Sequence, residues 1–243
     1  MQTANHPSTD HDAYSLPAHV RWTRALRALG RVLAHPDETD QVLVFSTYAN
    51  AGSAPHRLDR FFSDPRGQAL FDRKRALDSH TIDLDALLAL PEDTLGHAYA
   101  TFMRTHGLTP DVFDGAPQDV ADPRAAYVIQ RMRQTHDLWH VVTNAQTDPA
   151  GEIALQAFTF AQMGAPSSAI LATAGMLKTL RHKPQVVADV AAMLRLGRRA
   201  ERLVLFAWED HWATPLAEVR RLLGLPEQPR PIGGYTNLAF QAA

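Results

Sequence analysis

The residues best suited to chemistry lie in one short stretch, HDLWHVVTNAQTDPAGE, at positions 136–152. His136 and His140 are four residues apart, so on a helix both imidazoles project from one face, with Cβ atoms roughly 5–6 Å apart. The turn-forming residues that follow predict a helix end near Thr143 and a chain reversal that brings Glu152 back towards the histidines. Two imidazoles and a carboxylate are suitable ligands for a divalent metal. The spacing predicts a metal site, with a solvated polar helix end as the alternative.

Asp137 follows the first histidine and adds a second carboxylate. We expect it either to bind the metal or to orient a ligand from just outside the ligand set. The pattern resembles the H-E-x-x-H helix of zinc hydrolases, with Asp137 in place of the base. It also matches the two-histidine, one-carboxylate set of non-haem iron. Because the chain has no cysteine, thiolate ligands are excluded, and zinc, iron, manganese, cobalt and magnesium all remain open. The sequence assigns no further catalytic residue and no organic cofactor.

Composition and charge bound the class of protein. The chain has 243 residues, of which 45% are hydrophobic, enough for a sizeable core. Lys plus Arg number 24 and Asp plus Glu 26, a near-balance that argues against a nucleic-acid partner. The opening residues are polar and lack the apolar segment of a secretory signal. We expect a mobile polar tail over 1–15 and a single α-helical domain over 16–243, located in the cytoplasm.

Helical patterns predominate, and the expected fold class is all-α, a single compact multi-helix domain. Asp122 before Pro123 predicts a helix start, because aspartate accepts hydrogen bonds there and proline fits the first turn. Thr214 before Pro215 gives the same signal near the C-terminus. The only strand candidate is QVLVFS at 41–46. The expected helices span 16–35, 37–50, 90–107, 122–144, 151–164, 166–182, 185–212 and 214–225.

The span from Ile153 to Leu177 carries no charged side chain. Gly164 and Pro166 divide it, and each half is too short to cross a bilayer. We interpret it as a pair of buried core helices. The alternative is a wall for a long apolar ligand. The arginine-bearing segment 16–35 is expected to be a solvated helix face, with an anionic membrane surface as the alternative.

Arg131 and Arg133 precede the histidines. We expect them in structural or surface salt bridges, with contact to the metal carboxylates or to a substrate carboxylate as the alternative. WEDHW at 208–212 is interpreted as an interface or capping segment, because Glu209 and His211 do not face each other on a helix.

The spacing H-D-x-x-H, eleven residues, then E resembles the signature of the coenzyme Q (ubiquinone) biosynthesis protein four family. Other stretches are similar to that family over roughly residues 17–225. The last stretch, QPRPIGGYTNLAFQAA at 228–243, aligns with nothing in the family pattern. The similar stretches are DRFFSDPRGQALFDRK at 59–74, LPEDTLGHAYATFM at 90–103, YVIQRMRQTHDLWHVVTN at 127–144, and the GEIALQAF that follows.

The resemblance implies a mostly helical fold and a divalent metal at His136, Asp137, His140 and Glu152. It implies a metal-dependent lyase of ubiquinone biosynthesis, which oxidatively removes the C1 carboxyl group of a polyprenylated hydroxybenzoate. Two alternatives stand beside it: a non-catalytic scaffold that binds prenyl lipid and organises the other ubiquinone-biosynthesis enzymes, and a hydrolase with Asp137 as base. The implied partners are the prenylated quinone precursor, those enzymes and the inner face of the cytoplasmic membrane, where the protein would be peripheral. The apolar surplus adds a homodimer as a hypothesis.

Overall fold

The computed structural model describes residues 12–34, 39–113 and 119–235. Within these ranges the regular elements are helices and no strand is present, which confirms the all-α fold class. The strand candidate at 41–46 lies inside a helix. The α-helices are α1 (Ala18–Ala34), α2 (Thr39–Ala51), α3 (Ala54–Phe62), α4 (Pro65–Asp72), α5 (Leu84–Leu88), α6 (Leu95–Thr105), α7 (Pro123–Thr143), α8 (Pro149–Met163), α9 (Pro166–Thr179), α10 (Gln185–Arg199) and α11 (Leu216–Leu222), and the 3-10 helices are η2 (Pro110–Phe113), η3 (Leu203–Leu205) and η4 (Trp208–Asp210).

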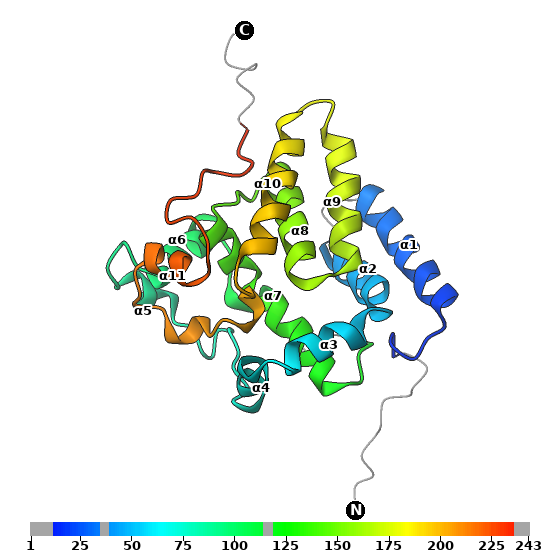
Figure 1. Cartoon of the computed structure of the whole chain (residues 1–243), viewed down its shortest axis with the longest axis horizontal. Coiled ribbons are helices and arrows are strands. Elements are labelled where there is room, and N and C mark those ends of the chain that lie inside the picture. Colours follow the sequence, from blue (N-terminus) through cyan, green and yellow to red (C-terminus); the bar gives the residue numbers. More distant parts are fainter. Residues whose placement is uncertain (1–11, 35–38, 114–118, 236–243) are drawn as a thin grey trace, which may run out of the picture.

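Helix α8 lies at the centre of a group of three packed helices. It packs extensively against both α10 and α9, and in Figure 1 it lies between them. Helices α1 and α2 form a hairpin, which reaches the rest of the molecule through contacts between α2 and α9. Helix α7 contacts α3, α6 and α11. The short connection 144–148 joins α7 to α8, so the two helices that carry the sequence motif meet at one turn.

Local sequence explains the bounds of α7 and α8. Asp122 and Asp148 each accept a hydrogen bond from a backbone N–H of the first turn, and each is followed by proline at the first helical position. At the other ends, Asn144 and Gly164 adopt left-handed backbone conformations with φ of 56° and 63°. Residues in that conformation commonly end helices. These signals set where the motif helices stop and start.

The prediction of one helix over 185–212 is wrong. Helix α10 ends at Arg199, and two short 3-10 turns follow. A buried side chain of α8 accounts for the break, because Gln162 bonds both sides of it. Its amide donates to the Gly197 carbonyl at 2.7 Å, and its oxygen accepts from the Leu203 N–H at 2.9 Å. The stop signal therefore comes from another helix.

Two other predicted helix starts are displaced. The helix expected over 90–107 begins at Leu95, because the Thr94 hydroxyl accepts the hydrogen bond that caps it. The last helix begins at Leu216 with no side-chain cap, so Thr214 does not play the predicted role. Instead, the Thr214 carbonyl accepts a hydrogen bond from the Leu95 N–H at 2.9 Å and ties the starts of α6 and α11 together.

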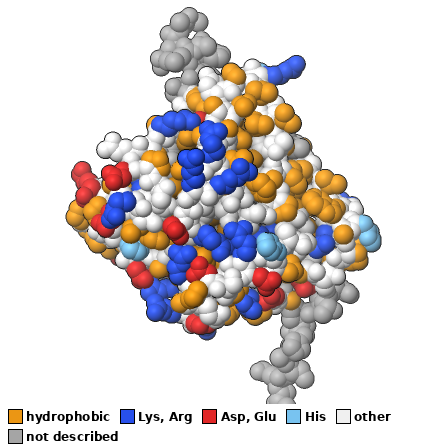
Figure 2. Space-filling view, viewed as in Figure 1, with side chains coloured by type: hydrophobic (Ala, Val, Ile, Leu, Met, Phe, Trp, Pro, Cys, Tyr) orange, Lys and Arg blue, Asp and Glu red, His pale blue; other side chains and the backbone are white. Residues whose placement is uncertain are grey.

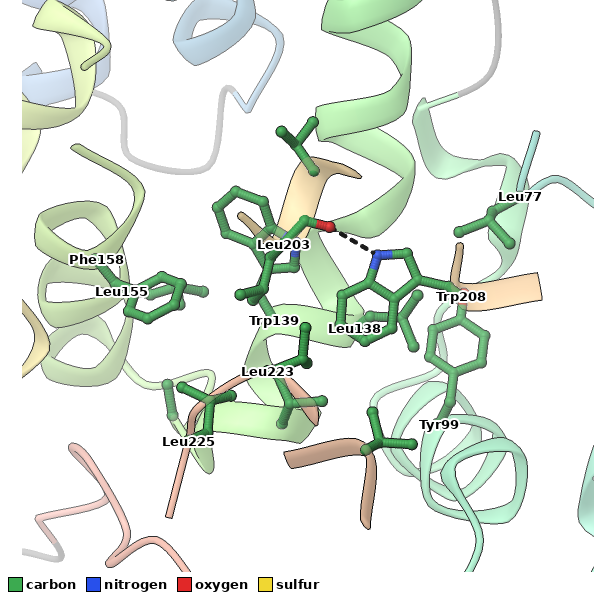
Figure 3. Packing of buried hydrophobic residues seen from close by; sticks show 14 of the residues in the cluster. Leu77, Tyr99, Leu138, Trp139, Leu155, Phe158, Leu203, Trp208, Leu223 and Leu225 are labelled. Atoms are coloured by element: carbon green, nitrogen blue, oxygen red, sulfur yellow. Dashed lines mark hydrogen bonds between the residues drawn. The ribbon is translucent and has the colours of Figure 1, made fainter. Parts of the chain in front are cut away.

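The main core forms around large side chains from α6, α7, α8 and the segment after α10. Figure 3 shows Trp139 of α7 beside Leu203 and Phe158, with Trp208 on the other side. The Trp208 indole N–H donates to the Leu203 carbonyl at 3.2 Å, so the buried ring leaves no polar atom unpaired. A separate and smaller hairpin core, between α1 and α2, consists of Ala13, Ala25, Ala28, Phe45, Tyr48, Ala49 and Ala51.

Part of the predicted polar tail packs against the folded chain. Ala13 is fully buried in the hairpin core, and its N–H donates to the Asp119 carbonyl at 2.8 Å. Residues 1–11 lie outside the described residues. The division into a tail over 1–15 and one domain over 16–243 stays a prediction.

The surface of the described chain includes exposed hydrophobic side chains on α1 and α9. Trp22, Leu26 and Leu177 are among them. Figure 2 shows hydrophobic side chains along the edge that these two helices form. None of the helices in the described ranges is long and apolar enough to cross a bilayer.

Candidate metal centre

Three of the four predicted ligand residues meet at the α7–α8 turn. His136, His140 and Glu152 each place a ligand atom within 4.8 Å of the others. His140 Nε2 lies 3.1 Å from Glu152 Oε1 and 3.3 Å from His136 Nε2. His136 Nε2 lies 3.7 Å from Glu152 Oε2. The chain reversal predicted from the sequence is present, and metal binding by these residues stays a prediction.

A backbone contact sets the direction of the His140 ring. Its Nδ1 lies 2.9 Å from the Ala145 carbonyl oxygen, which can only accept a hydrogen bond. The Nδ1 therefore carries a proton, and Nε2 is the ring nitrogen that faces Glu152 and His136. Histidines that bind metals usually donate their second ring N–H in this way. The donor set, two imidazole nitrogens and one carboxylate, therefore fits a divalent metal in both chemistry and orientation.

Glu152 and His136 shift each other's pKa values towards their charged forms. Burial raises the pKa of Glu152, but hydrogen bonds from the two histidines and their charges outweigh it and lower the pKa to about 2. Burial lowers the pKa of His136, but Glu152 and Asp137 outweigh it and the net pKa is raised. A carboxylate held ionised beside two imidazoles is an electrostatic environment that favours a cation.

Asp137 lies outside the three-residue cluster. It lines the same cavity as the cluster. Burial raises the pKa of its carboxyl, His136 and His140 partly offset this, and the negative charge of Glu152 reinforces it. Its two predicted roles, as ligand or as a neighbour of the ligands, both stay predictions.

A cavity of about 1150 Å³ opens beside the cluster. Its volume exceeds the 300–1,000 Å³ typical of small-molecule sites. The uncharged segment 153–177 supplies part of its wall, and its α8 half also packs into the main core. That this wall holds a long apolar ligand stays a prediction. The apolar side chains around it come from α1, α2, α7, α8 and α9 and include Leu29, Val42, Ile129, Met132, Ile153 and Leu171.

Comparison with known proteins identifies the family. The family model described as Coenzyme Q (ubiquinone) biosynthesis protein Coq4 matches residues 14–229. The chain belongs to this family. A relative from Laccaria bicolor, named a mitochondrial ubiquinone biosynthesis protein COQ4, is 31% identical over 199 residues, which cover 81% of this chain and 67% of the relative. A relative from Rattus norvegicus, named the mitochondrial COQ4 homolog, is 30% identical over 213 residues, which cover 86% and 80%.

A solved structure has a similar fold. It is a putative ubiquinone biosynthesis protein from Nostoc punctiforme, with a TM-score of 0.69 and 29% identity. The match covers 83% of this chain and 97% of that one. A role in ubiquinone biosynthesis therefore holds at the level of the family. The curated relatives named here are mitochondrial by name, and the cytoplasmic location and the homodimer stay predictions for this Coq4-family chain.

The two arginines before the motif face different surroundings. Arg131 is buried, forms an ion pair with Glu209 and donates to the Phe206 carbonyl at 2.8 Å. This is the structural salt bridge expected from the sequence. It ties Glu209 of the 208–212 segment to α7. Arg133 instead lines the cavity.

Two further polar residues reach the cavity, and no sequence pattern indicated them. Arg57 of α3 and Tyr14 join Arg133 in its lining, and both guanidinium groups act on the Tyr14 hydroxyl electrostatically. Burial lowers the pKa of Arg57 and of Arg133, although each stays a cation near neutral pH. Among the described residues, no carboxylate pairs with either guanidinium. Their placement depends on three segments far apart in the chain, which spacing alone does not bring together.

Proposed function

We propose that this family member oxidatively removes the C1 carboxyl group from a polyprenylated hydroxybenzoate, with a divalent metal at the α7–α8 turn. One observation carries the proposal: the cluster of His136, His140 and Glu152 opens into a large apolar cavity. The substrate has the same division, with a polar ring at one end and a long apolar tail. Membership of the family supports the pathway.

The chain offers a residue for each part of this task. His136, His140 and Glu152 would hold the metal, with Asp137 beside them. When bound, a divalent metal supplies Lewis acidity that polarises the ring and, if redox-active, a route for electrons. Asp137 lines the same cavity beside the cluster, where its carboxyl could act as a general acid or base towards the ring.

The walls of the cavity would bind and orient the substrate. Arg133 presents a guanidinium donor, which suits a carboxylate or phenolate because it can donate two parallel hydrogen bonds. Arg57 already donates to Ser53 and Asn50, and it adds positive charge to the same wall. The apolar side chains bury the prenyl tail at about 25 cal/mol per Å² of surface removed from water. They also exclude water, which strengthens the electrostatic contacts with the ring.

The net reaction defines what must be supplied from outside. The bond between the ring and the carboxyl carbon breaks, carbon dioxide leaves, and a carbon–oxygen bond forms at the same ring position. This change is a two-electron oxidation, so dioxygen or another oxidant is a required co-reactant. An assay without oxidant therefore serves as a blank.

A scaffold that only binds prenyl lipid is the second candidate. The size and apolar lining of the cavity favour it, because lipid binding needs no metal. The two candidates differ in what happens when a ligand residue is removed. A catalyst loses product formation and keeps lipid binding, whereas a scaffold that uses the metal structurally loses lipid binding or assembly.

The test compares wild type with His140→Ala and with His80→Ala, a control at an exposed histidine remote from the cavity. Metal is counted by plasma mass spectrometry, and carbon dioxide release is followed with a prenylated hydroxybenzoate and oxygen. We expect about one equivalent of metal and product formation in wild type and in the control, and loss of both in His140→Ala. Metal-free wild type after reloading would overturn the metal site. Loaded protein that binds the lipid but releases no carbon dioxide would favour the scaffold.

A further inference from the structure

The C-terminal segment 226–235, here called the C-terminal strap, crosses the α7–α8 turn. It is drawn in red beside α10 in Figure 1. Ile232 forms a parallel bridge with Ala145: its carbonyl accepts from the Gln146 N–H at 2.9 Å, and its N–H donates to the Asn144 carbonyl at 3.1 Å. The Asn144 side chain donates to the Pro229 carbonyl at 2.9 Å. The strap thus holds the connection between the two ligand-bearing helices.

One peptide group connects the strap to a predicted metal ligand. The N–H of the peptide between Ala145 and Gln146 bonds to Ile232, and its C=O accepts the hydrogen bond from His140 Nδ1. A trans peptide is planar, with N–H and C=O pointing in opposite directions. Fixing the N–H end therefore fixes the direction of the carbonyl and, through it, the plane and tautomer of the His140 imidazole.

The strap also contacts the start of α8, where Glu152 lies. Asp148 Oδ1 caps this helix by accepting from the Gly151 N–H at 3.1 Å, and it accepts from the Gly234 N–H of the strap at 2.8 Å. The approach is close. A Cβ on Gly233 would overlap Asp148 Oδ1, and a Cβ on Gly151 would overlap the Gln146 carbonyl oxygen. Glycine is required at both positions.

The far end of the strap is anchored on α10 by a buried acid. Asp189 has only 1% of its surface exposed. It pairs with Arg230 at 2.7 Å, accepts from the Gly233 N–H at 3.1 Å and accepts from the Tyr235 hydroxyl. An ionised carboxylate at this depth is costly unless it is paired and hydrogen-bonded. These three strap residues meet that requirement, so Asp189 fixes the path of the strap.

We propose that the C-terminal strap is a positioning element for the metal centre, in which Ile232 and Asp189 act through the Ala145–Gln146 peptide and the α8 cap to set the geometry of His140 and Glu152. This inference deepens the proposed function and rests on it for the metal. It separates the strap from a merely stabilising tail, because a positioning element changes ligand geometry in a fold that is still intact.

The experiment uses full-length protein with Gly233→Ala and Asp189→Asn. Leu70→Ala in α4 is the control, since it removes core contacts far from the strap. The probe is cobalt(II) alone, whose visible spectrum and dissociation constant are measured by titration. Loss of contacts that orient metal ligands typically weakens binding about 10–100-fold. We expect a loss of about tenfold or more with a changed spectrum in both strap variants. We expect the control to bind cobalt(II) with an affinity within about twofold of wild type, even if its melting temperature falls as far as that of the strap variants.

A second readout works without metal. Nitrogen-15 NMR of metal-free protein near pH 8 reports which ring nitrogen of His140 carries the proton. We expect Nδ1 of His140 to carry a proton in wild type and to lack it in part of the population of the strap variants. Unchanged cobalt affinity and an unchanged tautomer in folded strap variants would overturn the inference, as would an equal affinity loss in Leu70→Ala. If wild type binds no metal, the proposed function fails, and the tautomer alone decides whether the strap positions His140.

Discussion

The main core and the hairpin core differ in the size of their buried side chains. The main core contains Trp139, Trp208 and Phe158, all fully buried, whereas the hairpin core is mostly alanine. Two specific links join the hairpin to the rest: Asn50 exchanges hydrogen bonds with Ser167 of α9, and the Tyr48 hydroxyl donates to Asp119. The difference teaches that the walls of the cavity are held in different ways, since the hairpin forms one wall and helices of the main core form others.

The largest expected effect comes from the core-facing arginine of α7. Arg131→Met leaves Glu209 without its ion-pair partner in a mostly buried place, and breaking such a pair costs about 3–5 kcal/mol. Arg133→Met, two residues on but facing the cavity, should cost less than about 1 kcal/mol. Urea unfolding measures both. In the assay, Arg133→Met should raise KM for the prenylated hydroxybenzoate. Equal stability losses in the two variants would remove the distinction between the two sides of α7.

A smaller effect is expected at the link between hairpin and body. Asn50→Ala leaves the buried Ser167 N–H and hydroxyl without their partner, at a cost of about 1–3 kcal/mol. Because these hydrogen bonds reinforce the packing of α2 on α9, we expect amide exchange to rise in α1 and α2 and to stay unchanged in α7 and α10. Thr173→Ala, at an exposed α9 position, is the control. Faster exchange throughout the chain would show that the hairpin is not a separate unit.

The smallest effect should come from a helix cap outside the hairpin, at the start of α4. Asp64 accepts a hydrogen bond from the Arg66 N–H at the start of α4, and losing such a cap costs about 1 kcal/mol. Asp64→Ala should lower the urea midpoint slightly and leave hairpin exchange and prenyl-lipid binding unchanged. Asp64→Asn, which keeps a capping oxygen, should recover most of the loss. A change in lipid binding would mean that α4 and the cavity wall are coupled.

Local signals carried much of the prediction. The all-α class, the α7 start at Asp122 and the return of Glu152 to the histidines follow from periodicity, capping and turn chemistry within a short window. These features depend on residues that are neighbours in sequence. A side chain that caps its own helix needs no partner from elsewhere.

Contacts between distant segments account for what the sequence did not show. Gln162 ends α10 from a neighbouring helix, and the Arg57–Arg133 pair in the cavity forms only when α3 lies on α7. The C-terminal strap matched no pattern, because its role depends on backbone groups of the α7–α8 turn, and backbone groups leave no trace in residue type. Its glycines became interpretable only beside Asp148.

The missing side chain at Gly151 limits how the motif can be transplanted. Grafting H-D-x-x-H and the distant glutamate onto an ordinary pair of helices would copy the ligands without the tight passage beside Gln146 that Gly151 permits. It would also omit the C-terminal strap, which orients the Ala145–Gln146 peptide behind His140. For protein engineering, the smallest portable unit is therefore a discontinuous one: residues 136–152, the strap and the buried acid that holds it.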